Sequence, residues 1–229
     1  MARMCGRFTQ LASWPEVADF LRPLPVLPGP ESPGPSWNLA PSQPCRALRC
    51  AAEGSALEGV AMRWGLIPAW ARAADRRWNT FNARAESMAT KPSFRAAFRH
   101  RRCLVPASGY YEWSGEKGRR QPYCIRPEDV PLLLFAALWE PPRPESCGLP
   151  SLSIVTREAC GPLRALHERM PAMVPPGEAW TWCTGPTSAA MEIACAAKIP
   201  RLVWQAVDRQ LDRQQREGPE AIPARPPGL

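Results

Sequence analysis

The chain has 229 residues, a length that suits one globular domain with a sizeable hydrophobic core. Lysine and arginine outnumber aspartate and glutamate by 29 to 21, which gives a formal net charge of +8. This surplus favours an anionic partner, and nucleic acid more than a membrane surface, because no basic amphipathic helix is evident. Arginine-rich chains without such affinity are also common, so the charge alone does not decide the function.

Several classes of protein are excluded by what the chain lacks. Its nine cysteines are odd in number, form no CxxC pair and follow no signal peptide, so we expect a cytoplasmic protein without disulfides. The two histidines, His100 and His167, stand apart from any cysteine cluster, so we expect neither a metal site nor a cofactor. The longest apolar run, residues 132–139, is shorter than the about 20 residues that cross a bilayer. We expect a monomer that does not contact membranes.

The first third of the chain predicts a helix, a loop and two strands. Ser13 and Glu16 have the spacing of a capping box, and the apolar positions after them predict a short helix. Residues 22–36 contain six prolines and two glycines, which indicates a surface loop. Residues 45–50 and 56–63 alternate as strands do.

Two tryptophans that follow these strands receive different predictions. Trp64 lies beside a glycine at a turn and is predicted to be a core residue. Trp70 follows a proline, and we expect its ring to be exposed for stacking on a base, a contact typically worth about 1–3 kcal/mol.

The rest of the chain predicts more strands than helices. Residues 81–87 are polar and predicted to be irregular, and a short helix is expected to begin at Pro92. Brief helices are expected at 161–169, ended by Pro171, and at 188–198. Glycines at 115 and 118 predict a hairpin turn that places Glu112 near its end. Strands are predicted at residues 103–106, 110–113, 123–126, 132–138 and 152–156. Many short strands with scattered helices, and no βαβ rhythm, favour an α+β fold.

Cys5 lies close to the start of the chain, in Met4-Cys5-Gly6-Arg7-Phe8. A cysteine that is the first residue of a mature chain carries a thiol and a free α-amine on adjacent carbons. The α-amine has a pKa of about 8, so an appreciable fraction is neutral and nucleophilic at pH 7. Such an aminothiol can add to an aldehyde as an imine and then close to a thiazolidine, which an internal cysteine cannot do. A buried, inert cysteine is the alternative.

Several motifs occur in a characteristic order along the chain. They are Cys-Gly-Arg-Phe from Cys5, Trp-Asn-Leu-Ala-Pro from Trp37, Trp-Gly-Leu-Ile-Pro-Ala-Trp from Trp64, Phe-Asn-Ala-Arg-Ala-Glu from Phe81, Gly-Tyr-Tyr-Glu-Trp from Gly109 and His-Glu-Arg-Met-Pro from His167. In this order the chain closely resembles the SOS response-associated peptidase (SRAP) family, from Cys5 to about Val207. The resemblance implies a single compact α+β domain with a strained, antiparallel, β-barrel-like core. It also implies covalent capture of abasic sites in single-stranded DNA through an N-terminal cysteine.

The resemblance also implies roles for individual residues. Cys5 would be the nucleophile, Asn82 would orient the cysteine and the opened sugar, Glu112 would lie beside the reacting centre, and His167 would help to open the deoxyribose ring. Contacts with DNA would come from Arg7, Arg84, Thr156 and Arg169 at phosphates and from Trp70 at a base.

Elementary chemistry is consistent with these roles. An abasic deoxyribose is mostly a closed hemiacetal, and a histidine near neutral pKa suits the proton transfer that opens it. A glutamate held in its protonated form could donate to the oxygen that leaves as water. Structural roles are the alternatives: His167 could cap a helix end, Glu112 could pair with an arginine, and Arg7 could be an ion-pair partner.

The written start of the chain departs from the family pattern, because Met1-Ala2-Arg3 precedes Met4. While those residues remain, the nitrogen of Cys5 is an amide. We expect either translation from Met4 or removal of a leader of residues 1–4, and we favour the internal start. Residues 5–215 are then expected to form the catalytic and DNA-binding domain, and residues 216–229 a disordered tail.

Two other functions remain open at this point. The first is a thiol peptidase that uses Cys5, His167 and either Asn82 or Glu112, which would need no free α-amine. The family's peptidase name would then describe more than the exposure of its own terminal cysteine. The second is a non-covalent reader of modified bases, whose binding would survive Cys5→Ala.

Overall fold

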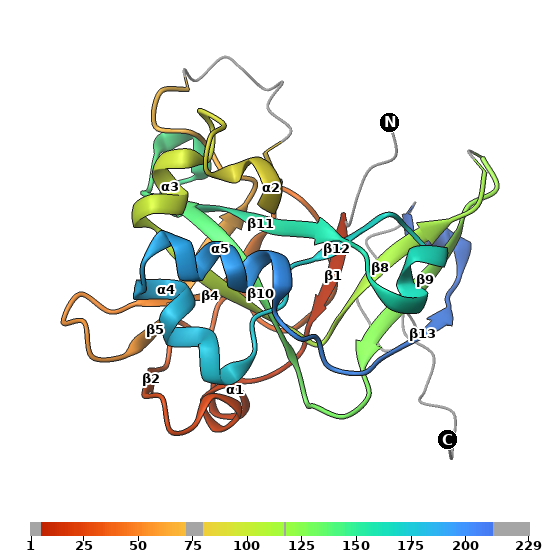
Figure 1. Ribbon diagram of the computed structural model, residues 1–229, viewed down its shortest axis with the longest axis horizontal. Coiled ribbons are helices and arrows are strands. Elements are labelled where there is room, and N and C mark those ends of the chain that lie inside the picture. Colours follow the sequence, from red (N-terminus) through yellow and green to blue (C-terminus); the bar gives the residue numbers. More distant parts are fainter. Residues whose placement is uncertain (1–5, 72–79, 117, 213–229) are drawn as a thin grey trace.

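The computed structural model describes residues 6–71, 80–116 and 118–212. Its strands form two sheets accompanied by short helices (Figure 1), so the predicted α+β class is confirmed. The five-stranded sheet has the order β13 (Leu202–Ala206), β9 (Gln121–Pro127), β8 (Gly109–Ser114), β1 (Arg7–Gln10) and β3 (Ser36–Leu39). The eight-stranded sheet has β12 (Arg169–Pro171), β11 (Ser151–Glu158), β10 (Leu133–Glu140), β7 (Arg102–Ala107), β4 (Pro44–Cys50), β5 (Leu57–Trp64) and β2 (Val26–Leu27), and β6 (Asn82–Arg84) pairs with β11.

The eight-stranded sheet curls back on itself. Besides its antiparallel partner β10, strand β11 pairs with β5 in parallel, with Ser151 opposite Arg63 and Leu152 opposite Trp64. This extra pairing joins the two strands that lie next to the ends of the sheet and gives it the predicted barrel-like form. The predicted antiparallel character is incomplete, however, because β6 also runs parallel to β11 and β2 parallel to β5.

Successive side chains of β10 point to opposite faces of the sheet, and the hydrophobic core is accordingly divided into two clusters. Leu133, Phe135 and Ala137 belong to a cluster inside the curled sheet, and the residues between them point to the outer face. Phe8 of β1 lies in the inner cluster, where its ring meets that of Trp64 edge to face at 5.0 Å. Trp64 is fully buried, as its predicted core role requires.

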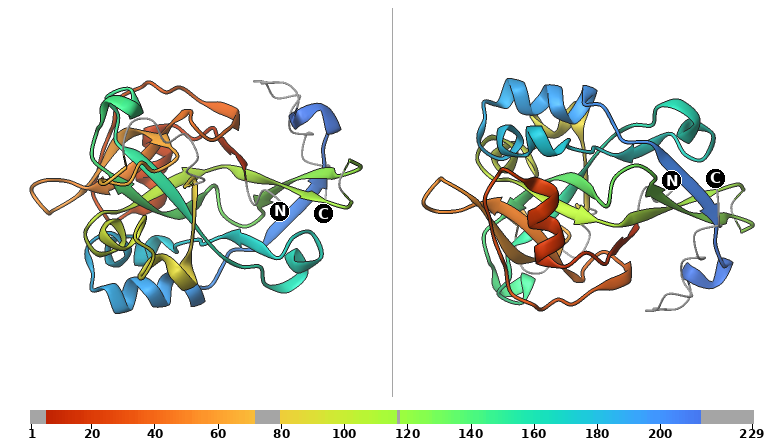
Figure 2. Two further views of the ribbon diagram at one scale, coloured as in Figure 1. Left: turned by 90° about the horizontal axis from the view of Figure 1, so that it is seen from above. Right: turned by 90° about the horizontal axis from the view of Figure 1, so that it is seen from below.

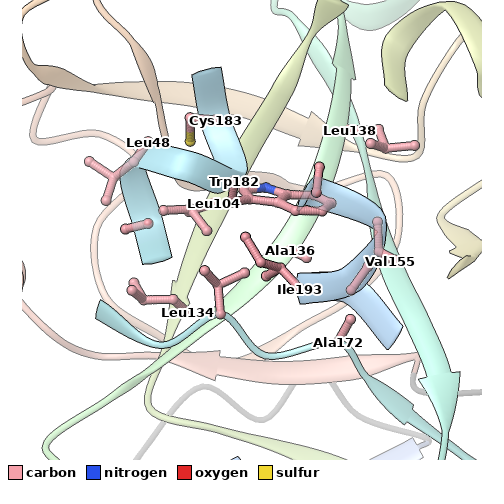
Figure 3. Close-up of a cluster of buried hydrophobic side chains, with 14 of the residues drawn as sticks. Leu48, Leu104, Leu134, Ala136, Leu138, Val155, Ala172, Trp182, Cys183 and Ile193 are labelled. Atoms are coloured by element: carbon pink, nitrogen blue, oxygen red, sulfur yellow. The ribbon is translucent and has the colours of Figure 1, made fainter. Parts of the chain in front are cut away.

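Two helices, α4 (Ala179–Thr184) and α5 (Thr187–Ala196), cover the outer cluster. Figure 3 shows Trp182 of α4 between Leu104, Leu138 and Ile193. Its indole Nε1 donates a hydrogen bond to the carbonyl of Cys103 at 2.8 Å, so the one polar atom of this ring is satisfied in the core. Figures 1 and 2 place α4 and α5 at the opposite end of the molecule from the β8–β9 hairpin.

The remaining helices are short, and the first has the predicted cap. In α1 (Trp14–Leu21), the carboxylate of Glu16 accepts from the amide of Ser13 at 2.7 Å, while the Ser13 hydroxyl accepts from the amide of Glu16. The other helical segments are α2 (Ala85–Met88), α3 (Arg95–His100), and the 3-10 turns η1 (Pro144–Ser146), η2 (Gly161–Ala165), η3 (Pro176–Glu178) and η4 (Arg209–Asp212).

Two local predictions were wrong. The expected helix at 161–169 is the 3-10 turn η2 followed by β12, because residues 169–171 pair with the edge of β11. Residues 81–87, expected to be irregular, contain β6 and most of the single-turn helix α2, because residues 82–84 pair in parallel with β11. Both errors arise from strand partners outside the segment itself, which override its weak local preference.

Some of the predictions concern parts of the chain outside the described residues. These are the leader of residues 1–4, Cys5 itself and the tail of residues 216–229. Within the described ranges, no helix has both the length and the apolar character that crossing a membrane would require.

Candidate functional site

Strand pairing at one end of β11 gathers four of the predicted site residues. Thr156 of β11 lies opposite Arg84 of β6, and Ile154, two residues earlier, lies opposite Asn82. On its other side β11 pairs with β12, which places Arg169 opposite Glu158. Residues from three separate segments of the chain therefore meet around the C-terminal half of β11.

A carboxylate and an imidazole meet close to this group. His167 precedes β12, and its Nε2 lies 3.8 Å from Oε1 of Glu112 on β8. Both side chains are shielded, with relative exposures of 10% and 2%. The pair joins the five-stranded sheet to the end of the eight-stranded sheet, and the structure thus brings together two of the predicted catalytic residues.

The hydrogen bonds of His167 fix which nitrogen carries the proton. Its Nδ1 accepts a hydrogen bond from the amide of Arg169 at 3.0 Å, so the neutral ring holds its proton on Nε2, the atom nearest Glu112. Burial lowers the pKa of His167 below its usual value, and the positive charges of Arg120 and Arg169 act in the same direction against the opposing charge of Glu168. The ring is therefore neutral at pH 7.

This burial predicts a specific dependence of stability on pH. Because the pKa of His167 is lower in the folded state, the unfolded chain binds more protons at mildly acidic pH, and folding stability is lost as pH falls below about 6.5. His167→Gln removes this titration. Chemical denaturation at pH 5, 6, 7 and 8 measures the free energy of unfolding of both proteins. Toward pH 5 this free energy should fall less for the variant than for the wild type. A constant difference across the four pH values would contradict the burial of a neutral ring.

Arg169 is held by protein groups on both sides of its guanidinium. Nη1 and Nη2 donate to the two carboxylate oxygens of Glu86 at 2.7 and 2.9 Å, and Nη2 also donates to the carbonyl of Thr156 at 2.7 Å. Burial would raise the pKa of Glu86, but the hydrogen bond and charge of Arg169 lower it overall. A phosphate that bound Arg169 would therefore have to share its fork with Glu86.

Thr156 has no exposed surface. Its hydroxyl lies 3.4 Å from the carbonyl of Ala83 and 3.4 Å from Nη2 of Arg169. The hydroxyl therefore lies between protein groups, and the phosphate contact that the family resemblance implies for this side chain stays a prediction. These two contacts place Thr156 between β6 and Arg169.

A groove of about 440 Å³ opens beside these residues. Its lining residues carry three positive and two negative charges, and they are Arg84, Glu158, Ala159, Arg164, Glu168 and Arg169. Arg84 is exposed at this surface, whereas Arg169 is 8% exposed. Of the two, Arg84 is the better placed to meet a phosphate from solvent.

The other two predicted DNA contacts lie on different elements. Arg7, the first residue of β1, donates from Nη1 to Oδ1 of Asn38 at 3.0 Å. Trp70 lies in the loop after β5, where the residue is 50% exposed and its Nε1 donates to the carbonyl of Pro92 at 3.3 Å. The exposed ring agrees with the prediction for Trp70, and its contact with a base stays a prediction.

Sequence reasoning missed two charged residues at this site. Glu86 stands in the Phe-Asn-Ala-Arg-Ala-Glu motif, so a signal was present, but its partner Arg169 is 83 residues away. Arg120 lies in the β8–β9 turn, where its charge lowers the pKa of His167. Nothing in the local sequence distinguishes Arg120 from Arg119 beside it.

The described thiols are free, and burial makes several of them unreactive. Burial raises the pKa of Cys45, Cys124 and Cys183 to about 12, so none of these is a thiolate at pH 7. In the same ranges of the chain, no three His, Cys, Asp or Glu side chains are grouped as a metal ion would require.

The fold and the site define a single-domain α+β protein with a buried carboxylate–imidazole pair beside an arginine-lined groove. Over residues 4–213 the chain matches the family described as SOS response associated peptidase (SRAP). The chain belongs to this family, and its predicted resemblance is confirmed.

Relatives with assigned names are similar over most of their length. The abasic site processing protein YoqW of Bacillus subtilis is 35% identical over 173 residues, which are 75% of this chain and 76% of that protein. The abasic site processing protein YedK of Escherichia coli is 29% identical over 231 residues, covering 96% and 99% of the two chains. A crystal structure of a protein from Bordetella bronchiseptica matches with a TM-score of 0.75 and 26% identity, covering 89% of this chain and all of that one.

Proposed function

We propose that this chain captures abasic sites in single-stranded DNA as a covalent thiazolidine on Cys5, and that it shields them from strand cleavage. The similar proteins named for abasic site processing support the substrate. The observation that carries the chemistry is the buried contact between Glu112 and the neutral ring of His167, because each step of the reaction needs a proton moved in a place shielded from water.

The described strand next to Cys5 leads to this pair. β1 begins at Arg7, which lies opposite Tyr111, the neighbour of Glu112 on β8. Cys5 precedes Arg7 by two residues, and a chain of that length spans at most about 7 Å. A covalent link of that length allows the amine and thiol of Cys5 to reach Glu112, which supports a shared site.

The reaction balances with one water lost. As the hemiacetal ring of the deoxyribose opens to the aldehyde, His167 gives its Nε2 proton to the ring oxygen, and the proton of the sugar hydroxyl returns to Nε2 by way of the Glu112 carboxylate, so the pair ends unchanged. The α-amine of Cys5 adds to the aldehyde carbon, and Glu112 assists the departure of the resulting hydroxyl as water, which leaves an imine. The thiol then adds to the imine carbon and its proton passes to the nitrogen, which closes the thiazolidine. Asn82 supplies neutral hydrogen bonds to the sugar without competing for protons.

One assay tests this function. The protein is incubated with a single-stranded oligonucleotide that holds one abasic site, and the mixture is heated and run on a denaturing gel without reductant. A shifted, heat-stable band is expected. A thiol peptidase would give no such band and would stay active with a blocked α-amine, and a non-covalent reader would bind the DNA but release it on the gel.

Arg84 is expected to hold a phosphate, since it is exposed on the groove. Arg84→Ala should weaken binding of all single-stranded sequences alike and reduce the slope of log affinity against log salt by about 0.7. Arg99→Ala, which removes an exposed charge from α3, is the control and should leave both unchanged. Fluorescence anisotropy titrations at several salt concentrations measure both quantities. A changed base preference at constant slope would exclude the phosphate assignment.

A further inference from the structure

We propose that Arg120, in the turn between β8 and β9, binds a phosphate of the bound DNA strand. The abasic sugar of the same strand would lie against the side chains of Glu112 and His167. This inference rests on the proposed function for the identity of the ligand. It adds a contact that neither the sequence motifs nor the family resemblance assigned.

The first observation is an unsatisfied donor. Nε of Arg120 is buried, yet it has no hydrogen-bond partner among the residues that the structure describes. Nε of Arg169 is also buried without a partner, but both Nη atoms of Arg169 donate to Glu86. In two other buried arginines of this protein, Nε has a protein acceptor. Arg46 donates to the carbonyls of Pro33 and Ala12, and Arg102 to those of Trp182 and Phe98. A buried donor without an acceptor is costly and rare in native proteins.

The second observation is an uncompensated charge. Within the described ranges, no carboxylate forms an ion pair with Arg120, whereas the neighbouring Arg169 is neutralised by Glu86. A half-buried guanidinium that lacks both a carboxylate and an acceptor for Nε is a ready partner for an anion. The planar fork of arginine matches two oxygens of a phosphodiester, the anion that every nucleotide of the proposed substrate carries.

The third observation is the position of the turn. Gln121, which follows Arg120, lies opposite Ser114, only two residues beyond Glu112 on β8. Strands rise about 3.3 Å per residue, so the turn begins about 7 Å past the Glu112 side chain. Figures 1 and 2 also place this hairpin at the same end of the molecule as η2, which leads into His167. The influence of Arg120 on the pKa of His167 agrees with this proximity.

The neighbouring Arg119 provides a matched control, because it carries the same charge one residue away and is exposed. Arg120→Ala should weaken binding of undamaged single-stranded DNA about tenfold, the effect of losing a charged hydrogen bond, and should lower the salt slope by about 0.7. Arg119→Ala should change affinity several-fold less. Arg120→Lys keeps the charge but loses the fork, and is expected to fall between Arg120→Ala and the wild type.

Methylphosphonate substitution identifies the phosphate. Single uncharged linkages are placed in turn at each position around the abasic site, and affinity is measured for wild type and Arg120→Ala. One linkage next to the abasic site should abolish the difference between the two proteins. An Arg120→Ala variant that folds, with an unchanged melting temperature, but binds every oligonucleotide as the wild type does would overturn the proposal.

Conjugate formation separates this inference from the proposed function. At saturating DNA, Arg120→Ala should form the conjugate at close to the wild-type rate, because the lost contact affects binding. Slower conjugation at saturation, with unchanged affinity and salt slope, would show that Arg120 serves His167 electrostatically instead and would also overturn the phosphate assignment. Binding of undamaged DNA tests Arg120 even if the wild type forms no conjugate.

Discussion

A protein whose first residue is Cys5 should form a conjugate with abasic single-stranded DNA that survives heating without reductant, and a protein that retains residues 1–4 should form none. The reason is covalent, since the nitrogen of Cys5 is an amide while Met4 remains attached. An amide nitrogen cannot form the imine that precedes ring closure. Mass spectrometry establishes the first residue of each preparation, and a denaturing gel measures the conjugate.

The two halves of Cys5 can then be tested separately. Cys5→Ala at the same N-terminus keeps the α-amine and removes the thiol, so it should give only an imine. That imine should reverse on heating, should be trapped by borohydride, and should permit strand cleavage by elimination. Cys195→Ser removes an exposed thiol from α5 and is the matched control, for which full conjugation is expected.

Contrary outcomes are easy to recognise. A heat-stable conjugate at Cys5 in the protein that retains residues 1–4 would exclude the thiazolidine. It would also favour the thiol-peptidase hypothesis, because a thiol nucleophile acts without a free amine. Conjugation lost with Cys195→Ser and kept with Cys5→Ala would assign the chemistry to a different part of the molecule.

Features that depend on neighbours in sequence were predictable from the sequence. The capping box between Ser13 and Glu16 spans three residues and contains all of its own hydrogen bonds. The β8–β9 turn was also visible, because Gly115 and Gly118 have positive φ angles of 104° and 92°, which glycine adopts without strain. In both places the residues that determine the local structure are neighbours in the sequence, so the sequence alone predicts it.

Features that depend on distant partners were not predictable in the same way. The pairing of residues 82–84 with β11 turned a segment expected to be irregular into β6. Strand β11 also pairs with residues 169–171, so these residues form β12 and not the end of the helix expected at 161–169. The motifs nevertheless singled out Glu112 and His167, which the structure brings into contact, because the order of the motifs along the chain is characteristic. The catalytic roles of the two residues stay predictions. Glu86 and Arg120 required the structure, since each is defined by what surrounds it.

Glu112→Gln and His167→Gln should each slow conjugate formation by about 10²–10⁴-fold, the usual contribution of a well-placed acid or base. Both replacements keep approximate size and hydrogen-bonding capacity, so they remove proton transfer with little change in packing. Binding of undamaged single strands should stay close to wild type, because neither side chain has the exposure that a phosphate contact needs. Rates are measured at saturating DNA on quenched gels, with affinity measured in parallel by anisotropy.

The double variant decides whether the two side chains act together. Because Nε2 of His167 lies 3.8 Å from the Glu112 carboxylate, removal of either should disable the same proton path. The double variant should then be hardly slower than the slower single variant, as is found for catalytic residues that work as a unit. Rate losses that multiply would show two independent steps, with His167 acting on the sugar and Glu112 on the departing water. Parallel losses of rate, binding and melting temperature would instead assign the pair a structural role, in which it only joins β8 to the segment before β12.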